Sequence, residues 1–370
     1  MPQIQKIRLA GTGSFLPGPP VPVDEIASRL GRLDQAPTAV RNFDSGPGPR
    51  MAQESGVRLR HFAIDPETGN LTHDHASLAA EACVRALDQA GVEPNEVELL
   101  AIAAPGVDGF SPPTSARLQA KLGIERCAEF AVHSNCSGVG KVLQIATDAI
   151  RLGRCTTALV AYSQLSSLFL RSAYLTQPAM TKSQALMRWI LSDGAGALVL
   201  RGAEDPDAAG HELVDVHVTS YAGTLEPAMT CEFGARSYLD PAATTESLVG
   251  EGRHHLDQDF TAVTRLATPL LDEAALRAHD QWGFKQEDAD HHILSIPTLQ
   301  LYEDARARRP DFSWERCPFR AAECGYCGGA AILVHLDQMA RGDEFKPGDV
   351  VSAFSIESSH WMGGGFLVRW

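Results

Sequence analysis

Cys136 is the residue of this sequence that is best placed to act as a nucleophile. It stands between a predicted strand (128–132) and a predicted helix (137–152), in the run HSNCSGVGKVLQ. Backbone N–H groups at the beginning of a helix stabilise a thiolate and lower the pKa of the thiol. The small residues Ser137 and Gly138 leave room for a substrate. We therefore predict that Cys136 takes up an acyl group as a thioester; the alternative is a buried, inert cysteine.

The other seven cysteines give no sign of a second reactive centre. In a chain of 370 residues without a signal-like beginning, we expect free thiols rather than a disulfide framework. Cys324 and Cys327 form a CxxC pair, but no second pair and no His pair stands at zinc spacing. The sequence also has no GxGxxG or GxxxxGK[ST] phosphate-binding loop. We expect no metal and no bound cofactor.

The overall composition excludes several classes of partner. The net charge is -14 and the pI is about 5.4, which argues against nucleic acid and against anionic membranes. Mean hydropathy is slightly negative, and no apolar run approaches the roughly 20 residues that span a bilayer. The first residues, MPQIQKIRLAGTGSFLP, lack the layout of a secretory signal. We therefore expect a cytoplasmic protein.

Helices and strands alternate along most of the chain. The all-apolar run at 99–104 is typical of a strand covered on both faces. Residues 17–56 are rich in Pro, Gly and Asp and predict an irregular excursion with a short helix near 23–31. The alternation predicts sheets that are mostly parallel. We expect strands at 5–14, 99–104, 128–132, 157–162, 195–200, 212–220, 291–296, 350–354 and 366–369, and helices at 72–90, 111–122, 137–152, 260–281, 299–308 and 328–340.

The chain also looks duplicated. The polar, turn-rich segment 202–211 separates two halves, predicted as residues 1–205 and 206–370. Each half contains a cysteine followed by small residues, a helix, a glycine stop and a buried strand, beginning at Cys136 and at Cys327. Self-similarity at this scale indicates two βα halves that pack back to back in an α/β fold.

The segment HSNCSGVGKVLQIATDAIRLG resembles the active-site segment of the β-ketoacyl-ACP synthase III-like branch of the thiolase superfamily. Three further stretches resemble the same family: SGVRLRHFA (55–63), GFSPPTSARLQAKLGI (109–124) and SDGAGALVL (192–200). The similarity extends over nearly the whole chain. It implies the thiolase fold, with duplicated βα halves in five αβαβα layers and usually a homodimer. It also implies an acyl-CoA or an acyl-carrier protein as substrate.

This chain departs from the family at two catalytic positions. The family has a His inside P-H-Q-A-N and an Asn inside G-N-T-S, where this chain has Ser295 and Tyr326; Thr298 ends the first motif. Ser and Tyr donate hydrogen bonds, but neither is an imidazole base at neutral pH. We therefore do not expect decarboxylation of a malonyl group. A register slip of three or four residues would instead bring in His291 or His292, which point to opposite faces of a strand.

The last loop offers a different base. Residues 358–360 replace glycines of the family, and the same register places His360 near the nucleophile, where it would activate the thiol or an acceptor. Glu357 would orient that ring, and Ser359 would contact substrate. The alternative is that the glycine run 363–365 is the true loop and that His360 lies on the surface.

Further substrate contacts are predicted from the same comparison. His133, three residues before the nucleophile, is a second candidate base, unless it is a hydrogen-bonded core histidine. Residues 165–190 correspond to the family's acyl tunnel and hold Trp189, although core packing explains that composition equally well. We assign substrate binding to Trp189, to Phe110 in the interface loop, and to Thr298.

The function that these residues favour is acyl transfer. Cys136 would accept an acyl group from an acyl-CoA or acyl-carrier protein and pass it to a small-molecule acceptor, in specialised metabolism. Two alternatives stay open. One is a ketosynthase that forms a carbon–carbon bond with a rebuilt base, and the other is a partner subunit of a larger acyltransferase complex.

Overall fold

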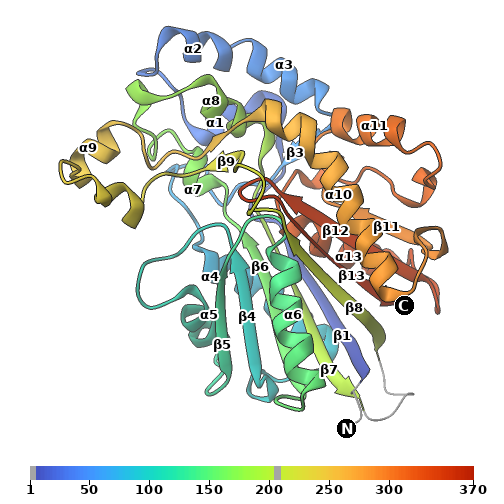
Figure 1. Ribbon diagram of the computed structural model, residues 1–370. Coiled ribbons are helices and arrows are strands. Elements are labelled where there is room, and N and C mark those ends of the chain that lie inside the picture. The colour runs from blue at the N-terminus through green and yellow to red at the C-terminus, as the bar shows by residue number, and fades with distance from the viewer. Residues whose placement is uncertain (1–5, 204–209) are drawn as a thin grey trace.

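A nine-stranded sheet runs through the computed structural model, which describes residues 6–203 and 210–370 (Figure 1). Its strands in spatial order are β11 (His291–Leu294), β12 (Val350–Glu357), β13 (Met362–Arg369), β8 (His211–Ser220), β1 (Lys6–Phe15), β7 (Gly194–Ala203), β6 (Thr157–Gln164), β4 (Leu99–Ala104) and β5 (Ala128–His133). β1 and β8 are paired only at Arg8 with Glu212 and at Leu9 with His211. This short pairing divides the sheet into a first lobe, with strands β1, β7, β6, β4 and β5, and a second lobe, with strands β8, β13, β12 and β11.

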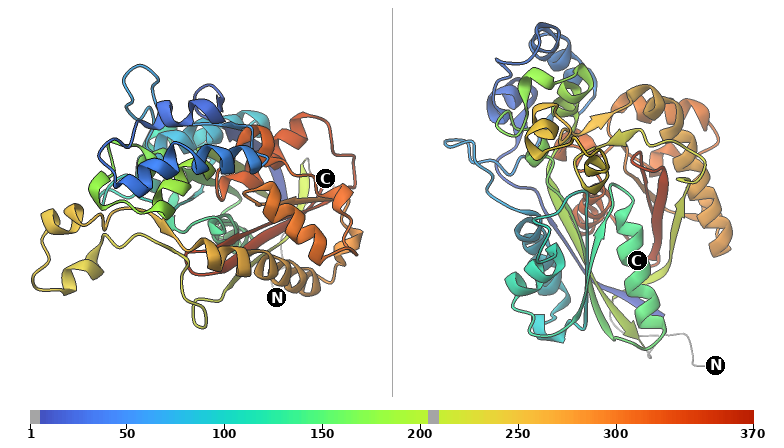
Figure 2. Two further views of the ribbon diagram at one scale, coloured as in Figure 1. Left: turned by 90° about the horizontal axis from the view of Figure 1, so that it is seen from above. Right: turned by 60° about the vertical axis from the view of Figure 1, so that its left-hand side comes forward.

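The two lobes enclose a layer of helices and are covered by helices on their outer faces (Figure 2). The layers in order are α4 (His75–Ala90) with α5 (Thr114–Leu122), the lobe β1–β7–β6–β4–β5, α6 (Gly138–Arg151) with α13 (Ala330–Arg341), the lobe β8–β13–β12–β11, and α10 (Phe260–Trp282) with α11 (Leu299–Arg308). The predicted five-layer αβαβα arrangement is therefore confirmed.

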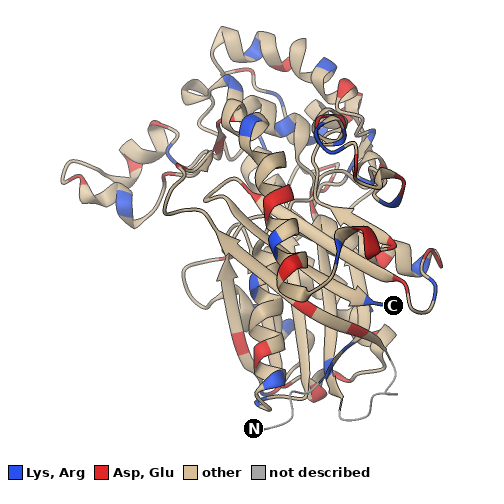
Figure 3. Ribbon diagram, turned by 45° about the vertical axis from the view of Figure 1, so that its right-hand side comes forward, with Lys and Arg blue, Asp and Glu red and all other residues tan. Residues whose placement is uncertain are grey.

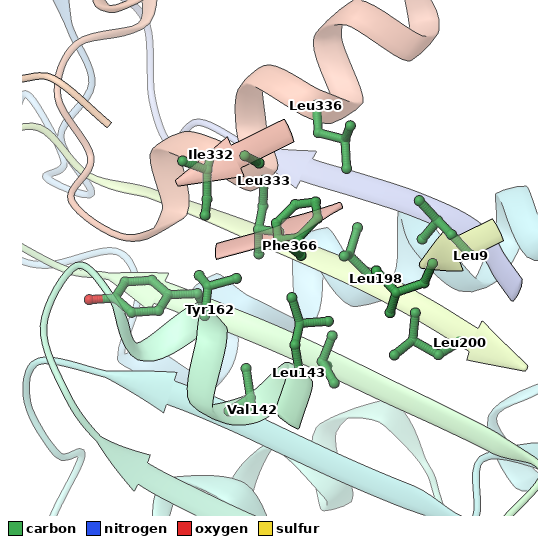
Figure 4. Close-up of a cluster of buried hydrophobic side chains, with 14 of the residues drawn as sticks. Leu9, Val142, Leu143, Tyr162, Leu198, Leu200, Ile332, Leu333, Leu336 and Phe366 are labelled. Carbon is green, nitrogen blue, oxygen red and sulfur yellow. The ribbon is translucent and has the colours of Figure 1, made fainter. Parts of the chain in front are cut away.

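The middle layer forms the main hydrophobic core. α6 contacts β4 and β6 on one side and β8 and β13 on the other, while α13 contacts β1 and β7 as well as β11 and β12. Their side chains, such as Leu143 and Leu333, are buried among residues of both lobes, including Leu198 and Phe366 (Figure 4). A helix between two sheets buries two faces, and only a narrow side of α6, with Lys141, Gln144 and Asp148, stays polar.

Local sequence patterns locate many of the elements correctly. The predicted strand at 99–104 is β4, and all six of its residues are buried. The helix predicted from residue 72 begins instead at His75, because the side chain of Asp74 accepts a hydrogen bond from the N–H of Ser77 and caps the helix there.

The expectation of mostly parallel sheets is wrong. Three neighbouring strand pairs of the large sheet are parallel and five are antiparallel. β12 and β13 are joined by the short hairpin 358–361, which forces them to be antiparallel. β7 follows the excursion after β6 and enters the sheet from the end at which β6 leaves it.

A cap of short helices lies over one end of the sheet, at the top of Figure 1. The segment 17–56, predicted to be mostly irregular, contains α1 (Ile26–Leu30), α2 (Thr38–Asp44) and α3 (Pro47–Glu54). α2 and α3 pack on α8 (Lys182–Ile190), so tertiary contacts stabilise helices that are too short to be stable alone. The remaining short elements are β2 (Val21–Pro22), β3 (Leu59–Arg60), α7 (Ser167–Leu170), β9 (Met229–Thr230), α9 (Thr245–Gly250), β10 (Asp257–Gln258) and α12 (Ala321–Cys324).

Charged side chains of both signs are interspersed along the outer helices (Figure 3). None of the helices within the described ranges is long and apolar enough to cross a membrane. The predicted boundary between residues 205 and 206 lies outside the described residues. The division into two halves therefore stays a prediction.

We expect Leu143→Ala to lower the free energy of unfolding by ~2–5 kcal/mol, because Leu143 is fully buried in the middle layer and its truncation leaves a cavity there. Leu152→Ala is the matched control, since Leu152 ends the same helix with 68% of its surface exposed and should change stability by less than ~0.5 kcal/mol. Denaturant unfolding measures both variants. Equal stability of the two would contradict the enclosed position of α6.

Candidate active site

Cys136 lies in the turn between β5 and α6, at the N-terminal end of a central helix. It is half-buried, and it lines a cavity of about 690 Å³. Ser137 is the N-cap residue of α6, but its side chain does not cap the helix. Instead, its Oγ donates a hydrogen bond of 2.6 Å to Glu357. Cys136 therefore lies at the beginning of the helix, as predicted, and it lines the cavity.

Two glycines allow the second lobe to approach the backbone of this turn. A Cβ at Gly329, just before α13, would lie 2.6 Å from the carbonyl oxygen of Cys136. A Cβ at Gly364 would lie 2.8 Å from the carbonyl oxygen of Ser137. Both distances are too short for any side chain. The glycine run 363–365 thus lies within β13 and packs against the nucleophile turn, rather than forming a loop.

Tyr326 and Ser295 lie beside Cys136. The phenolic oxygen of Tyr326 is 3.2 Å from the sulfur of Cys136. Ser295 follows β11, donates a hydrogen bond of 3.1 Å to the carbonyl oxygen of Gly328, and lines the same cavity as Cys136. Both side chains are buried. The second lobe thus brings both residues to the cysteine of the first lobe.

The surroundings of Cys136 favour the thiol over the thiolate. Burial raises the pKa of Cys136 to about 11; the hydrogen bond with Tyr326 acts in the opposite direction, and the carboxylate of Glu357 adds to the rise. The expectation of a lowered pKa is therefore wrong, because desolvation outweighs the helix N-terminus. Burial and the nearby cysteine also raise the pKa of Tyr326 far above its ordinary value, so the phenol keeps its proton and remains a donor.

The cavity in front of Cys136 is large and mostly apolar. Its apolar lining comes from α3, α8 and α10, and includes Met51, Met187, Ile190, Phe260, Val263 and Leu271. Among the described residues that line it, Asp304 is the only carboxylate and none is Lys or Arg. The volume lies within the range of small-molecule sites, roughly 300–1,000 Å³. The cavity therefore suits an uncharged, apolar group.

A buried carboxylate, Glu357, lies behind the nucleophile turn. Its Oε2 accepts hydrogen bonds from Ser134 Oγ (2.9 Å), Ser137 Oγ (2.6 Å) and Ser137 N–H (3.2 Å). Its Oε1 accepts from Ser359 Oγ (2.8 Å) and lies 2.5 Å from Nδ1 of His360. Burial alone would raise the pKa of Glu357, but the contacts with His360, Ser137 and Ser359 lower it to about 2.

The structure brings five of the eight predicted site residues to the cavity and places the other three elsewhere. Trp189 is buried but does not line the cavity, and its Nε1 donates a hydrogen bond of 2.9 Å to Asp44. Thr298 also serves as the N-cap of α11. The five that line the cavity are Cys136, Ser295, Tyr326, Phe110 and Thr298.

His360 and Ser359 lie in the hairpin between β12 and β13, on the far side of Glu357. His360 is 30% exposed, and neither residue is among those that line the cavity. Ser359 Oγ lies 3.1 Å from Nδ1 of His360. The predicted pairing of Glu357 with His360 is present, whereas the predicted roles of His360 as base and of Ser359 in substrate binding stay predictions.

The other candidate histidines are placed differently. His133 lines the cavity, with its Nε2 3.1 Å from the carbonyl oxygen of Pro105. His291 lies 3.0 Å from Asp349, and His292 is buried. Neither His291 nor His292 lines the cavity, so His133 is the imidazole that faces it among the described residues.

Four amide side chains line the cavity: Asn135, Gln164, Gln258 and Gln300. Asn135 directly precedes the nucleophile. Gln164 ends β6, and its Nε2 donates a hydrogen bond of 3.0 Å to Ser166. The polar pair Ser163 and Gln164 at the end of a buried strand was the available signal for Gln164.

Within residues 6–203 and 210–370, no group of three or more His, Cys, Asp or Glu side chains is arranged to hold a metal ion. The sulfur of Cys324 lies 3.2 Å from Nε2 of His335, and both residues are buried. The CxxC pair is therefore part of the core.

The fold is similar to those of several solved structures. AbyA1, described as a tetronic acid condensing enzyme, is 25% identical to the chain with a TM-score of 0.76, over 98% of this chain and 100% of that one. The 3-oxoacyl-[acyl-carrier-protein] synthase III of Aquifex aeolicus VF5 is 18% identical with a TM-score of 0.74, over 99% and 100%. A variant of Xanthomonas campestris OleA is 17% identical with a TM-score of 0.78, over 99% and 97%. A comparison with protein-family models found no match.

We expect Tyr326→Phe to slow the alkylation of Cys136 by iodoacetamide near pH 8 by about tenfold. The change removes a hydrogen bond that lowers the pKa of the thiol, and a bond to a charged group contributes ~1.5–3 kcal/mol. Mass spectrometry of the Cys136 peptide measures the rate. Tyr174→Phe is the control, because Tyr174 also lines the cavity but donates its hydrogen bond to the carbonyl of His254. Alkylation of Tyr326→Phe at the wild-type rate would remove this role.

Proposed function

We propose that this chain, which has the fold of the β-ketoacyl-ACP synthase III-like branch of the thiolase superfamily, is an acyltransferase that carries its acyl group on Cys136. The observation that carries the proposal is a thiol at the beginning of a central helix with an apolar cavity of about 690 Å³ in front of it. Tyr326 lies 3.2 Å from that thiol, and Ser295 lines the same cavity. These two residues stand at the positions predicted from the sequence for the family's Asn and His.

The first step is thioester exchange. The sulfur of Cys136 attacks the acyl carbonyl of an acyl-CoA or acyl-carrier protein, and the bond between that carbonyl and the donor sulfur breaks. The thiol proton of Cys136 leaves with the released thiol, so no proton is gained or lost overall. The thiolate is the attacking form of a cysteine, so with a pKa of about 11 the proton must leave the sulfur of Cys136 as the sulfur attacks. Tyr326 donates its hydrogen bond to the charge that develops.

The second step passes the acyl group to an acceptor. The oxygen, nitrogen or carbon nucleophile of a small molecule attacks the thioester, and its proton returns to the sulfur of Cys136. Decarboxylation of a malonyl group is disfavoured, because Ser295 and Tyr326 supply hydrogen bonds but no imidazole. The lining described above, with Asp304 and no Lys or Arg, also disfavours a carboxylate on the group that enters the cavity. Each methylene of the acyl chain that enters the cavity would contribute ~0.8 kcal/mol.

A second candidate function is carbon–carbon condensation. AbyA1 is 25% identical over the whole chain and is described as a condensing enzyme. A condensing reaction on Cys136 would need a base for the acceptor carbon. His133 lies at the cavity for this role, and His360 remains the candidate predicted from the sequence.

Intact-protein mass after incubation with a panel of acyl-CoAs tests the acyl-enzyme. We expect the wild-type protein to gain the mass of one acyl group, the adduct to be absent in Cys136→Ala, and longer apolar chains to load better than malonyl-CoA. Cys83→Ala is the matched control, because Cys83 is a buried core thiol. If acyl-carrier proteins are tested as well and no adduct forms from either donor, the proposal fails.

The loaded protein then distinguishes the two candidate reactions. A small amine or alcohol that releases the acyl group from Cys136 without loss of CO2 supports the acyltransferase. Discharge only by a β-keto or malonyl thioester, with a new carbon–carbon bond in the product, supports condensation.

A homodimer is the second part of the proposal. β5 is an edge strand of the described sheet, and Phe130 on it is 41% exposed. Phe110, which lines the cavity, is 96% exposed. An uncovered edge strand with an exposed aromatic residue is a natural site for pairing with a second chain.

We expect light scattering to give twice the chain mass of 39.8 kDa for the wild-type protein, and a shift toward the monomer for Phe130→Asp. A charge buried at the paired edge would weaken association. Leu152→Asp is the control, because Leu152 is 68% exposed on a different element. A monomeric wild-type protein would contradict this part of the proposal.

A further inference from the structure

We propose that Glu357 is a positioning residue of this site: its buried carboxylate holds Ser134 and Ser137, the two serines that flank Asn135 and Cys136, and so fixes the turn that carries the reactive sulfur. His360 serves as the partner of that carboxylate. The inference rests on the proposed acyl chemistry of Cys136, and it assigns to the hairpin between β12 and β13 a role behind the nucleophile rather than in front of it.

The geometry of the nucleophile turn carries the first part of the inference. One oxygen of Glu357 accepts three hydrogen bonds, from Ser134 Oγ, Ser137 Oγ and Ser137 N–H. Ser134 precedes the turn and Ser137 follows the nucleophile directly. A single carboxylate therefore ties both ends of the turn to β12. Ser355 Oγ, on the same strand, donates a further hydrogen bond of 2.9 Å to the carbonyl oxygen of Cys136.

The hairpin holds the other oxygen of Glu357. Ser359 Oγ donates to it at 2.8 Å, and Nδ1 of His360 lies 2.5 Å from it. The carboxylate itself is fully buried, while His360 is 30% exposed. A buried charge is tolerated only when it is paired and hydrogen-bonded. His360 and the serines provide this compensation, so the ring has a structural reason to face Glu357.

The charge state of Glu357 agrees with this arrangement. Its contacts with His360, Ser137 and Ser359 outweigh burial and lower its pKa to about 2. The stabilisation from these contacts is thus present above the ordinary pKa of a Glu and is lost as the pH falls toward 2. Glu357 is therefore a carboxylate at every pH at which the thiol reacts.

Glu357 is the carboxylate that affects the sulfur from behind the turn. Cys136 also interacts with three other titratable side chains: Tyr326 from the loop before α13, Tyr162 on β6, and Cys327. Burial raises the pKa of all three well above the ordinary values, so they are uncharged near neutral pH. The carboxylate adds to the rise in the pKa of Cys136. It therefore adds to the burial that keeps the resting cysteine protonated, while it fixes the turn.

Alkylation of Cys136 by iodoacetamide as a function of pH tests the effect of the charge. Glu357→Gln keeps the size of the side chain and removes the charge, so we expect the profile to move to lower pH by about one pH unit. Glu344→Gln, which changes a half-exposed carboxylate paired with Arg320, is the matched control and should not move it. A Glu357→Gln profile that stays in place or moves to higher pH overturns the inference.

Ser134→Ala tests the same idea without changing the charge. It removes one hydrogen bond from the carboxylate and leaves its charge less compensated, so the profile should move in the opposite direction, to higher pH. This variant decides the matter if Glu357→Gln does not fold. A shift to lower pH in Ser134→Ala would count against the inference.

A double-mutant cycle separates the two roles of His360. If the ring acts through Glu357, His360→Gln slows acyl loading in the wild-type background and adds nothing in the Glu357→Gln background. A base that acts directly would cost the same factor in both backgrounds, which would overturn the assignment of His360. The alkylation experiments need no acyl donor, so their outcome is independent of whether the proposed acyl transfer is correct.

Discussion

The enclosure of α6 and α13 between the two lobes is the constraint on which the rest of the structure depends. Both helices contact a sheet on each side, and most of their residues are buried, eight of fourteen in α6 and nine of twelve in α13. The helix ends that point toward the cap are where polar groups reach the cavity. Cys136 stands at the beginning of α6, and the loop that carries Tyr326 leads into α13. The packing of the core thus decides where a reactive group can reach open space.

The same enclosure determines the electrostatics of the site. Burial raises the pKa of Cys136 and of Tyr326, so the two groups meet as a neutral thiol and a neutral phenol. The one charge nearby, Glu357, lies behind the turn and is compensated by the serines and His360. An apolar cavity lies in front of the thiol and a paired carboxylate lies behind it, so the thiol rests protonated until an acyl donor enters.

The departures from the resembled family that the sequence predicts all lie after residue 290. By the predicted register, Ser295 and Tyr326 stand where the family has His and Asn, and the hairpin 358–361 carries polar residues where the family has glycines. The glycine run 363–365 lies within β13, which packs against the nucleophile turn there. The similarity to solved structures is one of fold, whereas the role of Cys136 and of the groups around it is part of the proposal.

Local patterns in the sequence determined the strand β4, the helix α6 and the position of Cys136 between a strand and a helix. These features depend on periodicity and on short motifs, which a single sequence contains. The prediction of Ser295 and Tyr326 rested instead on the resemblance to a known family. Only the tertiary structure decided three features: the direction of the pKa shift of Cys136, the burial of Trp189 away from the cavity, and the three hydrogen bonds from the nucleophile turn to Glu357. Each of these depends on contacts between residues far apart in the chain, as between Ser134 and Glu357, and on desolvation by several elements at once. No local pattern encodes such contacts, because they follow from how the two lobes pack.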